Sequence, residues 1–94
     1  MLISWDPAKN LKNIEKHHVR FEIAKYVFCD PFHLTEKNRI ENGEQRYQTI
    51  GEVQGVLLFV IHTMEEDEDG AFNVRLISAR KADRAERRKF EETR

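Results

Sequence analysis

Several residue types are scarce in this sequence. Its 94 residues include one cysteine, two prolines and four glycines, and the longest uninterrupted apolar run, Val56 to Ile61, is six residues long. That run is far short of the roughly 20 residues that cross a bilayer, and no basic, apolar leader precedes Trp5. We therefore expect a cytoplasmic protein with no membrane span. Cys29 has no cysteine with which to form an internal disulfide, and we expect it to be a buried, small apolar side chain rather than a nucleophile.

Motifs that hold metal ions or cofactors are also absent. The four histidines lack a Cys-x-x-Cys or His-Glu-x-x-His spacing, and no Gly-x-Gly-x-x-Gly, Walker or Gly-x-Ser-x-Gly pattern occurs. The acidic run from Glu65 to Gly70 matches the first positions of an EF-hand loop, but the position of its bidentate Glu falls on Leu76. We expect no metal, no cofactor and a solvated hairpin tip at this run.

The hydrophobic pattern predicts one α+β domain that spans residues 1–94. Asp6-Pro7 predicts a helix start, and this helix ends near His17-His18. Apolar residues from Val19 to Phe28 predict a second helix. The expected order is a strand at 2–5, the two helices packed on an antiparallel meander of four strands near 32–35, 47–50, 56–63 and 72–79, and a C-terminal helix after Ala82.

Charge is distributed unevenly along the chain. The net charge is -1, but residues 1–74 hold 8 Lys/Arg against 13 Asp/Glu, whereas residues 75–94 hold 8 Lys/Arg against 4 Asp/Glu. The balance therefore moves from -5 to +4 between these two segments. A basic C-terminal segment indicates either a surface for phosphates or an acidic partner, or a solvated helix face.

Cationic side chains are the chemical groups that the sequence offers. If several of them converge over one face of the sheet, they supply planar donors for a phosphodiester and groups that pass a proton. Cleavage of RNA needs little more, because the 2′-OH of the substrate is the nucleophile. Composition alone does not establish this convergence. The candidates are Lys9, Lys16, His17, Arg46, His62, Arg75, Arg80, Arg84, Arg87 and Arg88, of which we expect His62, in the most apolar strand, to be structural.

The order of these and other residues resembles the BrnT family, ribonuclease toxins of type II toxin–antitoxin systems with a RelE-like fold. The resemblance covers nearly the whole chain. Each element of it is weak alone, but their combination in one order is specific. The matching positions are Trp5-Asp6-Pro7, Lys9, Asn13, Lys16-His17, Val19, Phe21, Ala24, Phe28, Asp30-Pro31, Glu44, Arg46, Gly51, the run from Arg75 to Ala82, and Glu86-Arg87.

The resemblance implies a toxin that cleaves RNA without metal and inhibits translation and growth. It also implies a cognate BrnA-type antitoxin with a ribbon-helix-helix part, so that a toxin–antitoxin hetero-oligomer forms and operator DNA is bound only through the antitoxin. On this basis we expect catalytic roles for His17, Arg46 and Arg80, RNA binding by Lys9, Lys16 and Arg75, and antitoxin binding by Arg84, Arg87 and Arg88.

The chain departs from the family pattern at three positions. His18 stands where Gly is usual, at a helix end that often requires a positive φ. Arg20 replaces a Ser that is a good N-cap, and Phe90 replaces a common Tyr, whose hydroxyl is therefore missing here. Two other interpretations of the sequence remain: a non-catalytic basic module that binds an acidic protein or nucleic acid, and a toxin-like chain that has lost activity.

Overall fold

The computed structural model describes all residues, 1–94. It confirms the α+β class with a C-terminal helix. No helix in it is both long enough and apolar enough to cross a membrane. The elements in chain order are β1 (Leu2–Ser4), α1 (Pro7–His17), α2 (Phe21–Ala24), the 3-10 helix η1 (Lys25–Cys29), β2 (Leu34–Glu41), β3 (Glu44–Val53), β4 (Val56–His62), β5 (Glu65–Glu66), β6 (Phe72–Lys81) and α3 (Arg84–Thr93).

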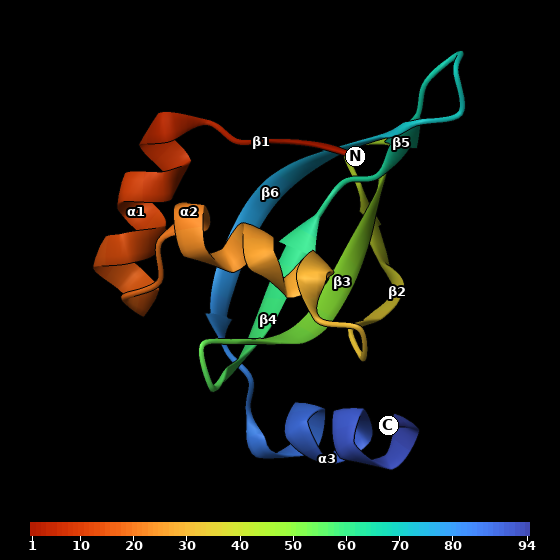
Figure 1. Ribbon diagram of the computed structural model, residues 1–94. Helices are drawn as coiled ribbons and strands as arrows, with labels where there is room; N and C mark the ends of the chain where they lie inside the picture. Colours follow the sequence, from red (N-terminus) through yellow and green to blue (C-terminus); the bar gives the residue numbers. More distant parts are fainter.

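The strands form one sheet in the order β1-β6-β4-β3-β2, with β5 paired to β6 outside this path (Figure 1). The expected antiparallel meander is confirmed for β2, β3 and β4, and β6 adds to β4 in the antiparallel sense. The sheet is nevertheless mixed, because β1 runs parallel to β6. The predicted hairpin tip after β4 is confirmed, since residues 65–70 are all exposed.

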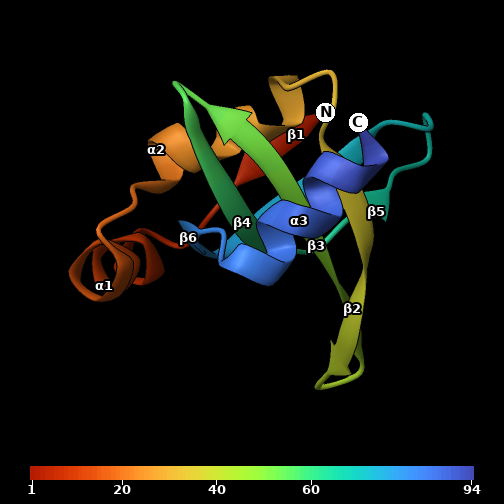
Figure 2. The same ribbon diagram turned by 90° about the horizontal axis from the view of Figure 1, so that it is seen from below.

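Helices cover both faces of the sheet (Figures 1 and 2). Side chains alternate along a strand, so Leu58 and Val60 of β4 pack with α2 and η1, while Leu57 and Phe59 pack against α3. Phe90 is the buried anchor of α3 in the second cluster. The C-terminal helix has little other apolar surface, and docking on the sheet holds it in place.

Helix α1 begins and ends as the sequence predicts. The Asp6 side chain accepts a hydrogen bond of 2.8 Å from the Ala8 N–H, and Pro7 occupies the first turn. At the other end, His18 is the C-cap, with φ 60° and ψ 28°. This left-handed conformation costs an L-residue other than glycine about 1–2 kcal/mol, so the departure from glycine at this position introduces strain.

Replacement of His18 by glycine is expected to raise the free energy of unfolding by about 1 kcal/mol, because glycine adopts positive φ without a Cβ clash. Urea denaturation monitored by circular dichroism measures this difference. His33→Gly is the control: His33 is an exposed histidine without positive φ. A His18→Gly variant that is no more stable than the parent would contradict the strain argument.

The second helix is shorter than predicted and changes to a 3-10 helix after Ala24. The apolar spacing explains this. Phe21, Ala24 and Val27 follow each other every three residues and are fully buried, and a helix with three residues per turn keeps all of them on one line against the sheet. Close packing continues onto β3, where a Cβ on Gly51 would lie 2.7 Å from the Val27 carbonyl oxygen.

The same geometry corrects the prediction for Cys29. Its side chain is exposed rather than buried, because Cys29 lies two residues beyond Val27, and in a 3-10 helix the inward positions recur every third residue. Arg20 makes no side-chain cap to α2, as its identity predicts. The buried Asn10 takes that role, because its Oδ1 accepts a hydrogen bond of 2.9 Å from the Phe21 N–H.

His62 is a buried structural residue, as predicted. Its Nδ1 lies 2.8 Å from the Thr63 carbonyl oxygen, and Nδ1 is the donor because a carbonyl oxygen only accepts. In the neutral ring Nε2 is then the acceptor, and it accepts from the Thr49 hydroxyl, whose oxygen lies 2.7 Å away. The Thr49 oxygen in turn lies 2.7 Å from the Thr35 hydroxyl. Tyr47 stacks on the imidazole at a centroid distance of 6.1 Å. Desolvation lowers the pKa of His62 below 6.5, which favours the neutral ring.

The stability of the fold is therefore expected to fall as the pH falls below about 6.5. His62 takes up a proton in this range in the unfolded chain but not in the native chain. The stability that the neutral His62 contributes is therefore fully present above the pKa of His62 in the unfolded chain, and it is lost as the pH falls toward the lowered pKa of His62 in the native chain. One such group changes the free energy of unfolding by at most about 1.4 kcal/mol per pH unit. Urea unfolding at pH 7.5, 6.5 and 5.5 measures the slope, which the control His33→Gln should retain. A flat profile would contradict a neutral His62.

Candidate functional site

A basic hollow lies between α1 and the C-terminal half of β6. Five residues of α1 and two residues of β6 line this hollow of about 180 Å³. Lys9, Lys12 and Lys16 are on the exposed side of the helix, and the half-buried His17 is in its last turn. The structure thus brings together three of the cationic residues that the sequence singled out, Lys9, Lys16 and His17, and adds Lys12.

Asn13 determines where α1 lies. Its side chain is buried, and it binds the edge of β6 as a neighbouring strand would: Nδ2 donates to the Ala79 carbonyl at 2.8 Å, and Oδ1 accepts the Ala79 N–H at 3.0 Å. Nδ2 also donates to the Val19 carbonyl at 2.9 Å. One amide side chain therefore fastens the helix, the following loop and the strand, and so positions the basic face of α1 beside Ser78 and Arg80.

His17 is in an environment that favours its neutral form. Desolvation lowers its pKa below 6.5, and the positive charges of Lys16, Arg80 and His18 lower it further. Arg80 is thus close enough to His17 to act on its charge. A neutral imidazole at pH 7 is able to accept a proton from a substrate hydroxyl.

Arg80 is on the sheet face that carries α3, in register with Phe59 of β4. Its guanidinium lies over the Phe59 ring, 4.5 Å from the centroid. Nη1 and Nη2 donate to the two Glu86 carboxylate oxygens at 2.8 and 2.9 Å, and Nη1 also donates to the Lys81 carbonyl at 3.2 Å. The hydrogen bonds to Glu86 raise the pKa of Arg80. Of the five N–H donors of an arginine, two remain for a ligand.

Glu86 has a second role that the sequence analysis missed. Its side chain accepts the Asp83 N–H at 2.9 Å, and the Asp83 side chain accepts the Glu86 N–H at 2.8 Å, which makes a capping box at the start of α3. The Asp-x-x-Glu spacing at 83–86 is a readable signal for this motif. The capping box and the Arg80 pair together tie the start of α3 to the end of β6.

Arg46 and Arg75 lie at the other end of the same sheet face. Arg46 is 3.2 Å from Glu41 and Arg75 is 2.7 Å from Glu44. The Nε of Arg46 is buried and has no hydrogen-bond partner. Arg46 precedes Ile50 by four positions on β3, which is about 13 Å of strand, and Ile50 is in the row of Phe59 and Arg80. The structure therefore does not bring Arg46 or Arg75 into contact with Arg80.

A sequence model of the family described as ribonuclease toxin, BrnT, of type II toxin-antitoxin system matches residues 5–86 of the chain. The chain belongs to the BrnT family. The family is one of ribonuclease toxins of type II toxin–antitoxin systems, and such a toxin implies an antitoxin partner. No curated protein matches the chain. The basic hollow of α1, Arg80 and Glu86 are all within the matched range.

The three arginines expected to bind the antitoxin are on α3 of this BrnT-family chain. Arg84, Arg87 and Arg88 are exposed, and none of them is in an ion pair. Lys89, by contrast, pairs with Glu36 of β2 at 2.7 Å and fixes the helix to the sheet. The outer face of α3 thus presents free positive charge.

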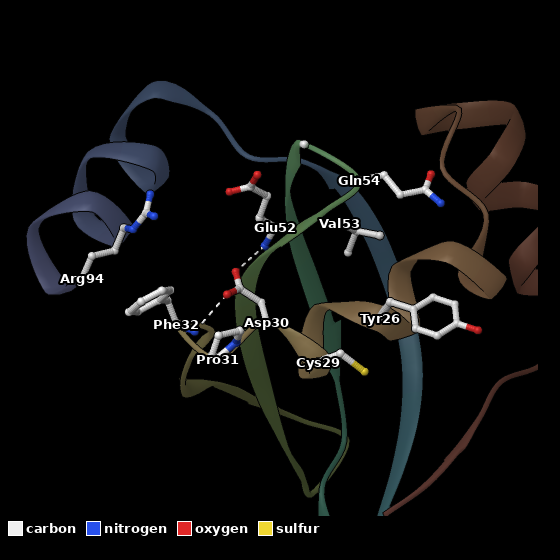
Figure 3. A pocket seen from close by; sticks show the side chains of 10 residues that line it. Tyr26, Cys29, Asp30, Pro31, Phe32, Glu52, Val53, Gln54 and Arg94 are labelled. Atoms are coloured by element: carbon white, nitrogen blue, oxygen red, sulfur yellow. Dashed lines mark hydrogen bonds between the residues drawn. The ribbon is translucent and has the colours of Figure 1, made fainter.

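The largest hollow of the molecule is away from the basic residues of α1. It has a volume of about 590 Å³ and lies between η1, the β3–β4 turn and Arg94 (Figure 3). Asp30 in its wall accepts hydrogen bonds from the Phe32 and Glu52 N–H groups, at 2.9 and 2.8 Å. Nowhere in the chain do three or more His, Cys, Asp or Glu side chains form a group suited to a metal ion.

Proposed function

We propose that the chain is a metal-independent endoribonuclease toxin that cleaves RNA through attack of the 2′-OH. The observation that carries this proposal is the hollow in which His17 lies among the lysines of α1 and within electrostatic range of Arg80. Membership of a family of ribonuclease toxins supports it. The domain is proposed to span residues 1–94 and to have the RelE-like fold of that class.

In the proposed reaction, the 2′-oxygen of the substrate attacks the adjacent phosphorus while the P–O5′ bond breaks. The proton of the 2′-OH passes to the neutral imidazole of His17, and the leaving 5′-oxygen takes a proton from the resulting imidazolium or from a lysine of the hollow. The two free N–H donors of Arg80 stabilise the pentacoordinate phosphate. The products are a 2′,3′-cyclic phosphate and a 5′-hydroxyl, so atoms and charges balance without a co-reactant.

The remaining cations are proposed to bind the RNA chain on either side of the scissile bond. Lys9 and Lys16 project from α1 and bind phosphates at the reacting end. Arg46, about 13 Å along β3 from the row of Arg80, and Arg75, at the same end of this face, bind other phosphates, or stabilise the reaction after the RNA has moved along this face. Each of these two arginines must exchange its glutamate partner for a phosphate, so we expect their contribution to decrease with rising salt concentration.

Incubation of the purified chain with a defined RNA in EDTA, followed by analysis of the new ends, tests the proposal. Cyclic-phosphate and 5′-hydroxyl ends are expected at full rate in the chelator. His17→Gln should abolish them, whereas His33→Gln, an exposed histidine on the η1–β2 loop, should leave them unchanged. A 5′-phosphate end, or activity that disappears in EDTA, would contradict the mechanism.

The proposed partner is a cognate BrnA-type antitoxin of the ribbon-helix-helix class. In the resulting hetero-oligomer the free arginines of α3, Arg84, Arg87 and Arg88, contact acidic groups of the antitoxin, and operator DNA is bound by the antitoxin part alone. The toxin is proposed to act in the cytoplasm. Induced expression without the antitoxin is therefore expected to inhibit translation and to arrest the growth of the cells. Co-expression of the antitoxin should restore growth.

One observation favours the alternative of a non-catalytic basic module. Arg80 is held by Glu86 in a bidentate pair that stabilises α3 irrespective of any substrate. Such a module binds RNA or an acidic protein with an affinity that decreases with salt but leaves RNA intact. The end-group assay separates the alternatives, and growth arrest on expression distinguishes an active toxin from a chain that has lost activity.

A further inference from the structure

A second groove lies between α2 and the start of β4 and has a volume of about 270 Å³. Its floor consists of aliphatic side chains, including the buried Leu58. Ile23 of α2 and Val56 of β4 also line it, although 37% and 39% of these residues are exposed. This groove therefore leaves apolar surface in water that the fold itself does not cover.

The rim of this groove is positively charged. The cations Arg20 and Lys81 line it together with His18, and no aspartate or glutamate does. None of the three is in an ion pair anywhere in the chain. An aliphatic floor surrounded by unpaired cations is complementary to a segment that carries apolar side chains flanked by carboxylates.

The apolar surface continues into the largest hollow. The two cavities share Val53 and Gln54 at the β3–β4 turn. Figure 3 shows Tyr26 on the same side of the large hollow as these two residues, with Phe32 and Arg94 on the opposite side. Tyr26 and Phe32 are both exposed aromatic residues. An extended segment seated on Ile23 and Val56 therefore has further apolar surface to follow.

We propose that this groove binds an acidic, amphipathic segment of the antitoxin. The inference rests on the proposed function, from which it takes the partner, and it adds a docking surface distinct from the outer face of α3. RNA is a poorer occupant, because the floor offers aliphatic side chains rather than the aromatic platforms on which bases stack. The groove also shares no lining residue with the basic hollow of α1, so both can be filled at once.

Titration calorimetry of the purified chain with the proposed cognate BrnA-type antitoxin tests this assignment. Ile23→Asp is expected to raise the Kd at least about 30-fold, the effect of a central interface residue. Arg20→Glu is expected to raise it about 10-fold. The matched controls are Ile40→Asp and Lys37→Glu on β2, which make the same kinds of change at exposed residues outside the groove and should bind as the parent does. Thermal melts confirm that each variant is folded.

RNA cleavage by the same variants, measured without antitoxin, separates this inference from the proposed function. Unchanged cleavage together with weakened antitoxin binding supports the groove. Equal antitoxin affinity of groove variants and controls overturns it, while cleavage continues to support the toxin assignment. If the groove variants bind RNA more weakly but bind the antitoxin as the parent does, the groove is an RNA site, and the proposal that it binds the antitoxin is overturned. An antitoxin that fails to bind the parent chain overturns both the proposed partner and this groove.

Discussion

Replacement of Arg80 by alanine is expected to reduce the rate of RNA cleavage by about 10²–10³-fold, with little change in RNA affinity. Arg80 provides two free N–H donors and lies within electrostatic range of His17. Donors that act on the charge of the transition state contribute more to the rate than to binding of the ground state. Single-turnover cleavage at saturating enzyme measures the rate of the chemical step. Arg39→Ala, an exposed arginine on β2, is the control and should cleave as the parent does.

The partner of Arg80 distinguishes catalysis from simple anchoring of α3. Glu86→Gln keeps the hydrogen bond to the Asp83 N–H but removes the negative charge that holds Arg80. If Arg80 acts on the phosphate, Glu86→Gln should retain or increase cleavage while lowering thermal stability. If Arg80 is only an anchor, Arg80→Ala and Glu86→Gln should lower stability alike and change cleavage alike, which would remove Arg80 from the mechanism.

Replacement of Asn13 by alanine is expected to lower the free energy of unfolding by about 3 kcal/mol or more. The substitution leaves the Ala79 N–H and the Ala79 and Val19 carbonyls without partners inside the protein. Each buried polar group without a partner costs about 1–3 kcal/mol. Since a domain of this size is stabilised by only about 5–15 kcal/mol, this is the largest stability loss that we expect from one polar side chain. Urea denaturation measures it.

Two further variants make the Asn13 prediction specific. Lys12→Ala changes an exposed neighbour on the same helix and should alter the free energy of unfolding by no more than about 0.5 kcal/mol. Asn13→Asp keeps an acceptor for the Ala79 N–H but loses the donor to two carbonyls and buries a charge, so it should destabilise at least as much as alanine. A loss below about 1 kcal/mol for Asn13→Ala would mean that water replaces these hydrogen bonds.

Local signals predicted most of the fold correctly. Asp6-Pro7 marked the start of α1, and the change to an alternating apolar pattern after Pro31 marked the strands of the meander. The second helix was only partly predicted. Its apolar residues recur every three positions, a spacing that fits a 3-10 helix but is also found in α-helices, so the change of helix type after Ala24 was not predicted.

The candidate site was predicted less completely. The residue types of the basic hollow were identified, but the distance that separates Arg46 from Arg80 depends on the register of three strands and was not readable from the chain. Asn10 and Asn13 were not predicted to have a structural role. Asparagine is a poor helix former, so two asparagines three residues apart on one helix face are a signal for such a role. Glu86 was overlooked as the partner of Arg80 despite the readable capping box.

The sequence by itself determined the class of the fold, the ends of its first helix, the strain at His18 and the family of ribonuclease toxins to which the chain belongs. These features depend on neighbours within a few positions or on residue identity in order. Only the tertiary structure decided that Asn13 completes the edge of β6, that Arg80 pairs with Glu86, and that an aliphatic groove with a cationic rim remains uncovered. Asn13 and Ala79 are 66 positions apart, and the groove lies between separate elements of the fold. Arg80 and Glu86 are only six positions apart, but they meet because α3 packs on the sheet beyond the end of β6. These contacts depend on strand register and helix packing.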